Sequence, residues 1–506
     1  MIYFIPSWYK DADWKEREAA WYIQSQKTEL DDTVKQIQLF SRNKLYDYQI
    51  ALLAHAPNFR RFLHRQSIFR ANYWSVFDAI QCITTRRIGL ISYMDLNWPK
   101  GIEFVYTPFV IYANLHSENY AKLEFGEDGN LIYIDRFENG ELIGKNVYDD
   151  RGFVSMNVLY EDGVARFERY LNPDGVWKIQ TDIQTGEVLV NPESAFYLGV
   201  DGEKKYSKER YGCLEDILLE VFTDYLSHTD LNDIFSLAMD NNHYQICEQV
   251  LAKRKLLLSF YADRCNLEDT EIDGIISKAK YIVTDRRSNM AKLRRKGLQN
   301  RNNICDITPY DFRIDESIGQ EFSERKILVA IDELPQYYLE EMIRELGMYM
   351  ASNPKVKIHL FTRRLSSEVG SQMKQILIDN LGEGNPLIAR FEVTQHNDAL
   401  EINRAIRESI MLIDLADKPD MFLGMTSLSL GIPQLLTQET RFVRADRNGQ
   451  IIKNLNEIGS WLDYYLTDLS HLNEAKIESY KLGNTYSAER LKEMWVKVIE
   501  DINRAD

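Results

Sequence analysis

The sequence lacks the features of several protein classes. It has five cysteines among 506 residues, and no two of them form a C-x-x-C pair. Scattered cysteines in odd number argue against a disulfide framework and a zinc site, and favour free thiols in a reducing compartment. No run of about 18 apolar residues predicts a transmembrane helix, and Met1–Pro6 is too short for a signal peptide. These absences predict a cytoplasmic protein.

Positive charge is also in short supply. The chain has 61 lysine and arginine residues against 77 aspartate and glutamate residues, which gives a net charge of −16. A negative field of this size repels phosphates, so we expect no nucleic-acid binding. For the same reason, any contact with an anionic membrane must be local and peripheral.

The motifs of common catalytic sites are missing. The sequence has no G-x-S-x-G, P-loop or H-E-x-x-H motif. The acidic pair Asp149 and Asp150 has no matching histidine, and His55 and His64 have no accompanying nucleophile. Turns, helix ends and packing explain these residues better than catalysis does. We therefore expect no catalytic residue, no metal site and no cofactor.

Glycine does not occur before Gly89, but later it recurs at a regular interval. Most of these later glycines lie in Asp-Gly or Asn-Gly pairs, which adopt the positive φ angles of tight hairpins. The pattern predicts an antiparallel β-sheet meander over residues 103–204. Six glycines at alternating spacings of 11 and 12 residues mark its turns: Gly129, Gly140, Gly152, Gly163, Gly175 and Gly186.

Outside the meander, short apolar strands alternate with amphipathic helices, which predicts α/β lobes with parallel sheets of the doubly wound type. Residues 1–102 and 205–315 are expected to form a discontinuous first lobe. Residues 316–506 are expected to form a second lobe, with the boundary in the polar segment 315–323. Two Rossmann-type lobes that face a cleft, followed by C-terminal helices, are the outline of a GT-B glycosyltransferase.

Further elements are expected on either side of the meander. A short apolar segment is expected at residues 421–423, and a basic helix is expected at residues 289–296. Helices are also expected across residues 14–40 and 399–412, and a strand at residues 88–92.

The second lobe contains a segment that resembles the donor site of retaining GT-B enzymes. In that family, two glutamates are separated by seven residues. A glycine follows five positions after the second glutamate, and a proline follows two positions after the glycine. Aligning this pattern on Gly431 and Pro433 places the glutamate positions at Lys418 and Thr426. Neither residue is acidic, so neither can replace the hydrogen bonds of a carboxylate to sugar hydroxyls.

The first strand of this lobe leads to two further departures from the family. There, an arginine and a lysine clamp the nucleotide pyrophosphate. In this sequence the strand runs into Asp332 and Glu333, which would repel an anionic donor. The resemblance therefore implies a glycosyltransferase fold whose donor positions are degenerate.

Aromatic residues suggest two surfaces. Trp8, Tyr9 and Trp14 could stack on sugar, but core packing is the favoured interpretation because they precede or begin an amphipathic helix. In the meander, exposed rings would form a patch for a partner protein, although about half of them are expected to pack on the first lobe. These candidate partner-binding residues are Tyr133, Phe137, Phe167 and Trp177.

A basic run could form another contact surface. It could hold phosphate, anionic lipid or an acidic partner, whereas a solvated helix face is the simpler interpretation. Its candidate binding residues are Arg294, Arg295 and Lys296, which follow Arg286, Arg287 and Lys292.

Four phrases resemble the first of the accessory Sec system proteins: YFIPSWY at 3–9, FLHRQ at 62–66, FVYTPF at 104–109 and YDDRGFVS at 148–155. The resemblance implies a cytosolic, glycosyltransferase-like component that acts with two sister accessory proteins and the accessory SecA ATPase. Together they export a serine-rich-repeat glycoprotein adhesin. The meander would then be akin to the extended β-sheet of the enzymes that glycosylate this adhesin.

Two functions remain open on the sequence. The favoured one is a non-catalytic binding subunit of the accessory Sec system, because the donor positions carry unsuitable residues. The alternative is an active GT-B transferase that adds a hexose or N-acetylhexosamine to serine or threonine of the adhesin. Binding of a nucleotide sugar would separate the two.

Overall fold

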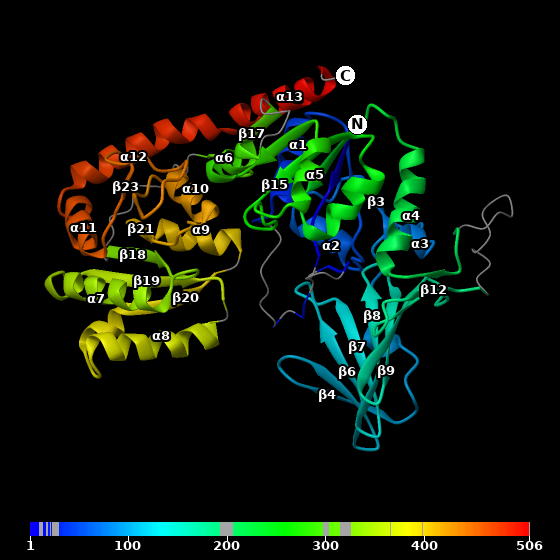
Figure 1. Ribbon diagram of the computed structural model, residues 1–506. Coiled ribbons are helices and arrows are strands. Elements are labelled where there is room, and N and C mark those ends of the chain that lie inside the picture. Colours follow the sequence, from blue (N-terminus) through cyan, green and yellow to red (C-terminus); the bar gives the residue numbers. More distant parts are fainter. Residues whose placement is uncertain are drawn as a thin grey trace.

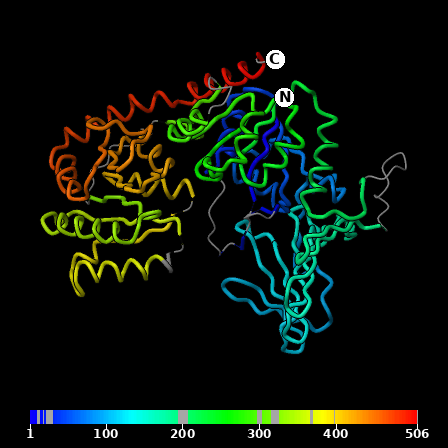
Figure 2. Tube along the Cα trace, viewed as in Figure 1, coloured from blue at the N-terminus to red at the C-terminus, as the bar shows by residue number. Residues whose placement is uncertain are grey.

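The computed structural model contains two lobes and a projecting antiparallel sheet (Figures 1 and 2). The sheets of both lobes are parallel and have helices packed against them, so the predicted α/β class with an inserted meander is confirmed. The predicted boundary at 315–323 lies outside the described residues. The structure describes residues 1–9, 14–16, 19–20, 22, 30–192, 206–296, 303–313, 325–364, 366–396 and 398–504.

The first lobe is built on a seven-stranded sheet in the order β17-β16-β15-β14-β1-β2-β3. Its central strands are apolar and buried on both faces, as expected for a parallel sheet covered by helices. The strands are β1 (Ile2–Ile5), β2 (Tyr48–Leu52), β3 (Tyr73–Ser75), β14 (Ile234–Ala238), β15 (Lys255–Phe260), β16 (Tyr281–Thr284) and β17 (Ile304–Asp306). The helices are α1 (Asp32–Asn43), α2 (Phe59–Arg65), α3 (Val76–Ile80), α4 (Leu214–Ser227), α5 (Glu271–Lys278) and α6 (Arg287–Arg295).

One expectation for the first lobe is confirmed only in part, and another is wrong. Within the helical range expected at 14–40, residues 14–16, 19–20 and 22 are not helical, and residues 17–18, 21 and 23–29 lie outside the described residues. Helix α1 begins at Asp32, where the Asp31 carboxylate caps it by accepting from the backbone N–H of Thr33. The strand expected at 88–92 is not formed: Ile91 packs on the antiparallel sheet, whereas Leu90 is 90% exposed. The alternation of apolar residues there reflects a segment that lies across a sheet rather than one paired within it.

The second lobe has a six-stranded sheet in the order β20-β19-β18-β21-β22-β23. The helix expected at 399–412 ends at Arg407, and residues 411–414 form a buried strand instead. The strands are β18 (Arg325–Ala330), β19 (Val356–Thr362), β20 (Phe391–Gln395), β21 (Met411–Asp414), β22 (Gln434–Leu436) and β23 (Gly449–Ile451). The helices are α7 (Gln336–Ser352), α8 (Ser366–Leu381), α9 (Ala399–Arg407), α10 (Met421–Leu430), α11 (Ile458–Thr467) and α12 (Leu469–Gly483).

The inserted sheet has ten strands in sequence order from β4 to β13. All six regularly spaced glycines have positive φ, between 71° and 97°, which explains why hairpin turns form there. Residues such as Tyr170, Ile179 and Val188 are fully buried in the core of the first lobe. The strands are β4 (Ile102–Tyr106), β5 (Ile111–Leu115), β6 (Glu118–Phe125), β7 (Leu131–Glu138), β8 (Glu141–Asp149), β9 (Phe153–Glu161), β10 (Val164–Leu171), β11 (Trp177–Asp182), β12 (Val188–Val190) and β13 (Arg210–Tyr211).

The C-terminal helix α13 (Ala488–Arg504) joins the two lobes. Figure 1 shows it running from the second lobe across the top of the first. Its Trp495 ring lies edge-on to Phe40 of α1, with centroids 5.5 Å apart, and both belong to the core of the first lobe. Among the described helices, none is long and apolar enough to cross a membrane.

Candidate functional site

The segments after the carboxyl ends of the two parallel sheets carry residues that contact one another across the lobes. In α/β sheets, ligands bind at these ends. Strand β18 leads to Asp332 and Glu333, and β21 leads to Asp414, Lys418 and then α10. On the other side, β15 of the first lobe leads to Tyr261 and Arg264.

Asp332 occupies the hydrogen-bond donors of the loop after β19. Its carboxylate accepts from the Thr362 hydroxyl at 2.6 Å and from the Arg363 backbone N–H at 2.7 Å, and it pairs with the Arg364 guanidinium at 3.2 Å. A free backbone N–H in such a loop is what a phosphate needs. Glu333 is exposed beside it, with a φ of 62°. The first position of the expected pyrophosphate clamp is therefore a carboxylate that takes up donors itself.

A second ion pair closes the same end of the sheet. Arg363 donates through Nε and Nη2 to the Asp420 carboxylate, at 3.0 and 2.7 Å. Asp420 also caps α10 by accepting from the backbone N–H groups of Phe422 and Leu423. Burial raises the pKa of Asp420, but Arg363 and these N–H groups outweigh burial, so the pKa lies below its usual range.

The two degenerate glutamate positions lie in different environments. Lys418 reaches across to the first lobe, where its Nζ lies 3.0 Å from the Asp263 carboxylate; both side chains are more than half exposed. Thr426 is buried in the middle of α10. A surface pair such as Lys418–Asp263 contributes about 0–1 kcal/mol. The structure thus does not bring Lys418 and Thr426 together as two hydroxyl-binding groups.

Tyrosine side chains fill part of the space between the lobes. The hydroxyls of Tyr261 and Tyr310 both donate to the Leu30 carbonyl at 2.8 Å, and they also contact each other. The Phe422 ring of α10 packs edge-on to Tyr310, with centroids 5.2 Å apart. Leu30 itself packs against the core of the second lobe. The lobes are therefore held together by buried contacts near the donor positions.

Asp414 is a buried acid at the end of β21. Burial raises its pKa to about 7, although its carboxylate accepts from the backbone N–H groups of Asp420 and Ala416. The folded protein keeps the Asp414 proton up to about pH 7, whereas the unfolded chain releases it near pH 4. The contribution of Asp414 to the free energy of unfolding is therefore fully present below pH 4 and is lost as the pH rises to 7.

Replacing Asp414 with asparagine should therefore change the pH dependence of stability. Between pH 5 and 7 the natural chain loses stability because Asp414 ionises in the unfolded chain but stays protonated in the fold, whereas asparagine ionises in neither state, so the free energy of unfolding of the variant should improve relative to the natural chain over this range. The gain is at most about 1.4 kcal/mol per pH unit. Urea unfolding at both pH values measures it, and an equal difference at pH 5 and 7 would contradict the prediction.

The basic helix predicted at 289–296 is confirmed as α6, but acids on neighbouring segments match much of its charge. Lys296 pairs with Asp273 at 2.7 Å, and Lys292 pairs with Glu268 at 3.1 Å. Arg294 donates to a backbone carbonyl of β17, and Arg295 is exposed. Such pairing weakens any local positive field.

The aromatic residues predicted as surfaces differ in burial. Trp8, Tyr9 and Trp14 are buried in the first lobe, as the core interpretation held. The four candidate rings of the inserted sheet are half-buried: Tyr133, Phe137, Phe167 and Trp177. Tyr133 contacts the core of the first lobe, and basic side chains lie over three of the rings: Lys145 over Tyr133, Arg166 over Phe167 and Arg169 over Trp177.

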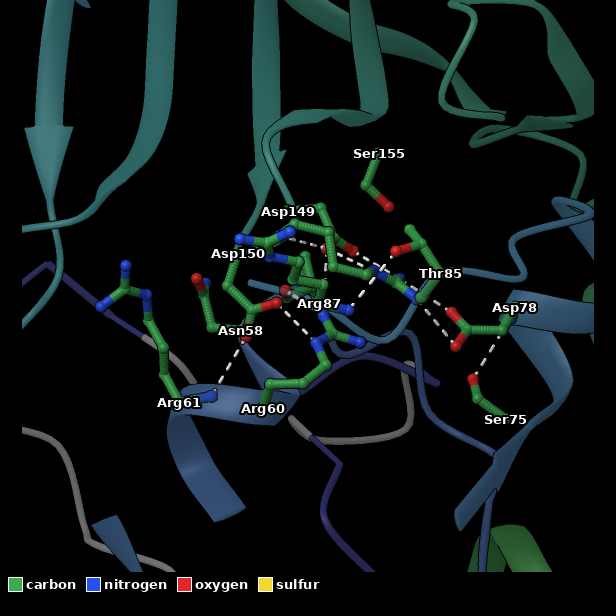
Figure 3. Close-up of polar contacts among 12 residues, drawn as sticks. Asn58, Arg60, Arg61, Ser75, Asp78, Thr85, Arg87, Asp149, Asp150 and Ser155 are labelled. Carbon is green, nitrogen blue, oxygen red and sulfur yellow. Dashed lines mark hydrogen bonds and ion pairs between the residues drawn. The ribbon is translucent and has the colours of Figure 1, made fainter. Parts of the chain in front are cut away.

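The turn between β8 and β9 differs most from what the sequence led us to expect (Figure 3). The acidic pair Asp149 and Asp150, expected as a simple turn, is buried against the first lobe. Arg60 of α2 donates to Asp150 at 2.5 Å and to Asp149 at 3.0 Å. Arg151 of the same turn pairs with Asp149 at 2.7 Å and with Asp78 of α3 at 2.8 Å.

This buried network fixes the inserted sheet to the first lobe. The sequence signal that could have found it is the acid–acid–base triplet beside Gly152, which is unusual for a solvated hairpin turn. His55 lies next to it and hydrogen-bonds Ser155 at 2.8 Å, while burial lowers the pKa of the imidazole to about 3. A neutral, packed histidine agrees with the structural role expected for it. The described residues contain no cluster of three or more acids, histidines or cysteines that could hold a metal.

The chain is similar to known proteins along its whole length. A family model for the first accessory Sec system protein of the Asp series matches residues 1–383 and 374–502. A curated protein of the same description from Streptococcus gordonii is 29% identical over 98% of this chain and 99% of its own. Another from Staphylococcus aureus (strain NCTC 8325 / PS 47) is 30% identical over 100% of both chains.

Solved structures show the same likeness. A chain in the structure of accessory secretory proteins 1, 2 and 3 from Streptococcus pneumoniae has a TM-score of 0.86 and 26% identity over 100% of both chains. A chain of the glycosylation-associated Gap123 complex from Streptococcus agalactiae has a TM-score of 0.81 and 28% identity over 98% and 100%. The pneumococcal O-GlcNAc transferase GtfA has a TM-score of 0.74 at 11% identity over 100% and 99%. This last likeness confirms the predicted GT-B-like fold and nothing beyond the fold.

Proposed function

Because the chain belongs to the family of the first accessory Sec system protein, we propose that it is a non-catalytic, glycosyltransferase-like subunit of that system. In this role it binds two sister accessory proteins, the accessory SecA ATPase and the serine-rich-repeat glycoprotein adhesin that they export. It works in the cytoplasm, with at most peripheral contact at the inner membrane face. The chains that it resembles in the pneumococcal and Streptococcus agalactiae structures belong to complexes of three such proteins, which supports the sister proteins as partners.

The observation that carries the non-catalytic role is the hydrogen bonding of Asp332. A transferase must hold the diphosphate of its donor with positive charge and free N–H groups. Here a carboxylate accepts from Thr362 and the Arg363 backbone N–H at the corresponding place. The largely buried guanidinium of Arg363 is committed to Asp420. A nucleotide sugar would have to displace both acids against Coulomb repulsion.

We therefore expect no saturable heat when the purified chain is titrated with UDP-glucose or UDP-N-acetylglucosamine. Because Lys418 and Thr426 bind no sugar in this proposal, Lys418→Ala and Thr426→Ala should leave adhesin export unchanged. Isothermal titration calorimetry and secretion assays measure the two results. Saturable binding that is lost in these variants would overturn the proposal and favour an active transferase that adds a hexose or N-acetylhexosamine to the adhesin.

A further inference from the structure

The outer edge of the inserted sheet is formed by β4, which lies at the margin of the sheet in Figure 1. Its one strand neighbour among the described residues is β5. An edge strand presents a row of unpaired backbone N–H and C=O groups, to which another chain can add a strand. The question is whether β4 is protected against such pairing.

Protection would take the form of a bulge, a proline, a charged side chain or a cover over the edge. Six successive strand pairs in the interior of the sheet, from β5–β6 to β10–β11, each contain a register shift. The β4–β5 pair contains none. Strand β4 reads IEFVY, with no proline and one charged side chain, Glu103, which is exposed. Apart from the short β11–β12 and β12–β13 pairs at the other end of the sheet, β4–β5 is the pair without a register shift, so this edge has neither the bulge nor the proline of a protected edge.

The turn that follows β4 shows which of its backbone groups point outward. The Thr107 N–H donates to the Val110 carbonyl, so these two residues form a hydrogen-bonded pair. In an antiparallel ladder, hydrogen-bonded and non-bonded pairs alternate. Counting back along the regular pairing, Val105 and Glu103 bond to β5, whereas the backbone groups of Phe104 and Tyr106 point away from the sheet.

Large apolar side chains of β4 are exposed on both faces of the sheet along this edge, Tyr106 on one face and Val105 on the other. Tyr106 is 61% exposed and Val105 is 46% exposed, although both are large and apolar. Phe104 is supported from one side by Tyr93 and Trp98 of the segment that crosses the sheet. The edge is therefore backed by packed residues and does not depend on a binding partner to be formed.

We propose that the edge of β4 is a docking site for an extended strand of a second protein, which adds an eleventh strand to the sheet by pairing with Phe104 and Tyr106. This inference rests on the proposed function, because it assigns one of the sister accessory proteins to this surface. The incoming strand is apolar where it flanks Tyr106 and carries lysine or arginine beside Glu103, whose exposed carboxylate lies on the opposite face.

A pair of substitutions at Tyr106 separates backbone pairing from side-chain contact. Tyr106→Pro removes an outward-pointing N–H and leaves the bonds between β4 and β5 intact, whereas Tyr106→Ala removes only the side chain. We expect the affinity of the full chain for the co-expressed sister proteins to fall at least about tenfold in Tyr106→Pro and by about threefold or less in Tyr106→Ala. The control is Tyr337→Ala on α7, a tyrosine of similar exposure in the second lobe, which should have no effect.

Hydrogen–deuterium exchange reads the same edge directly. In the isolated chain the amides of Phe104 and Tyr106 should exchange fast and those of Glu103 and Val105 slowly; in the complex all four should be slow. Equal losses of affinity in the proline and alanine variants, or no loss in either, would overturn strand addition while leaving the proposed function standing. A dimer of the chain alone that Tyr106→Pro dissociates would replace the partner by a second copy. Failure of the natural chain to bind either sister protein would overturn the proposed function and this inference together.

Discussion

Replacing Arg60 with alanine is expected to lower the free energy of unfolding by about 3–5 kcal/mol, one of the largest effects of any single substitution in this chain. The substitution leaves the carboxylates of Asp149 and Asp150 in the interior without their shared cation. Burial already raises the pKa of Asp150, and Arg60 is the main group that opposes this shift. Guanidinium chloride unfolding at pH 7 measures the loss.

The matched control lies on the same helix. Arg65 of α2 also pairs with an aspartate of the inserted sheet, Asp128, at 3.3 Å, but both side chains are partly exposed. Arg65→Ala should cost about 1 kcal/mol or less, because surface ion pairs contribute little. The cost of Arg60→Ala should also shrink as the pH falls from 7 to 5, since the carboxyl of Asp150 can then take up a proton, whereas Asp149 keeps its pair with Arg151. If Arg60→Ala costs no more than Arg65→Ala, the network does not hold the sheet.

The inserted sheet shares its hydrophobic core with the first lobe. Ile179, Val188 and Tyr170 of the inserted sheet belong to the same hydrophobic core as the strands of the first lobe. The sheet is therefore an extension of that lobe, although the sequence presents it as a separate repeat. A partner that pulls on the sheet would transmit the load to α2 and α3 through Arg60 and Arg151.

The inserted sheet was predictable because its signal is local. Each hairpin needs a residue with positive φ, and the regular glycines announce these turns without reference to the rest of the molecule. The errors fell where tertiary contacts decide: residues 88–92 cross the sheet instead of pairing, and Met411–Asp414 pairs with β18 although it continues a helical pattern.

The region between the lobes was less predictable. The sequence located Lys418 by alignment on a glycine and a proline, and Asp332 by its place after the first strand of the lobe; both follow the carboxyl ends of strands, which is where such a site must lie. It did not reveal their partners, because Lys418 and Asp263 are brought together only when the lobes meet. The same holds for Arg60, whose carboxylates are about ninety residues away in the sequence. A local pattern, such as the acid–acid–base triplet beside Gly152, can indicate that a pair is buried, but it does not identify a partner that is distant in the sequence.

Substitution of Gly89, in the segment where the expected strand is not formed, should have the second large effect on the free energy of unfolding. Its N–H donates to the Asp150 carbonyl at 2.9 Å, and a Cβ atom there would lie 2.3 Å from the Arg151 carbonyl oxygen. Neither backbone can retreat, because the Arg151 turn is fixed by buried ion pairs. Gly89→Ala should therefore destabilise the protein by about 1–3 kcal/mol, as overpacking does elsewhere.

Gly370 of α8 provides the opposite result from the same substitution. A Cβ atom there meets nothing within 4 Å, so Gly370→Ala should raise the free energy of unfolding by about 0.5–1 kcal/mol through helix propensity. Denaturant unfolding of both variants compares them on one scale. Equal effects would mean that residue 89 has room to move, and that the turn of Asp150 and Arg151 is not clamped. A loss at residue 89 with a gain at residue 370 instead requires a rigid turn, because only a fixed carbonyl makes the added methyl group costly. Residue 89 would then have to be glycine because the segment packs against the turn that attaches the sheet, a requirement that the apolar pattern of residues 88–92 does not reveal.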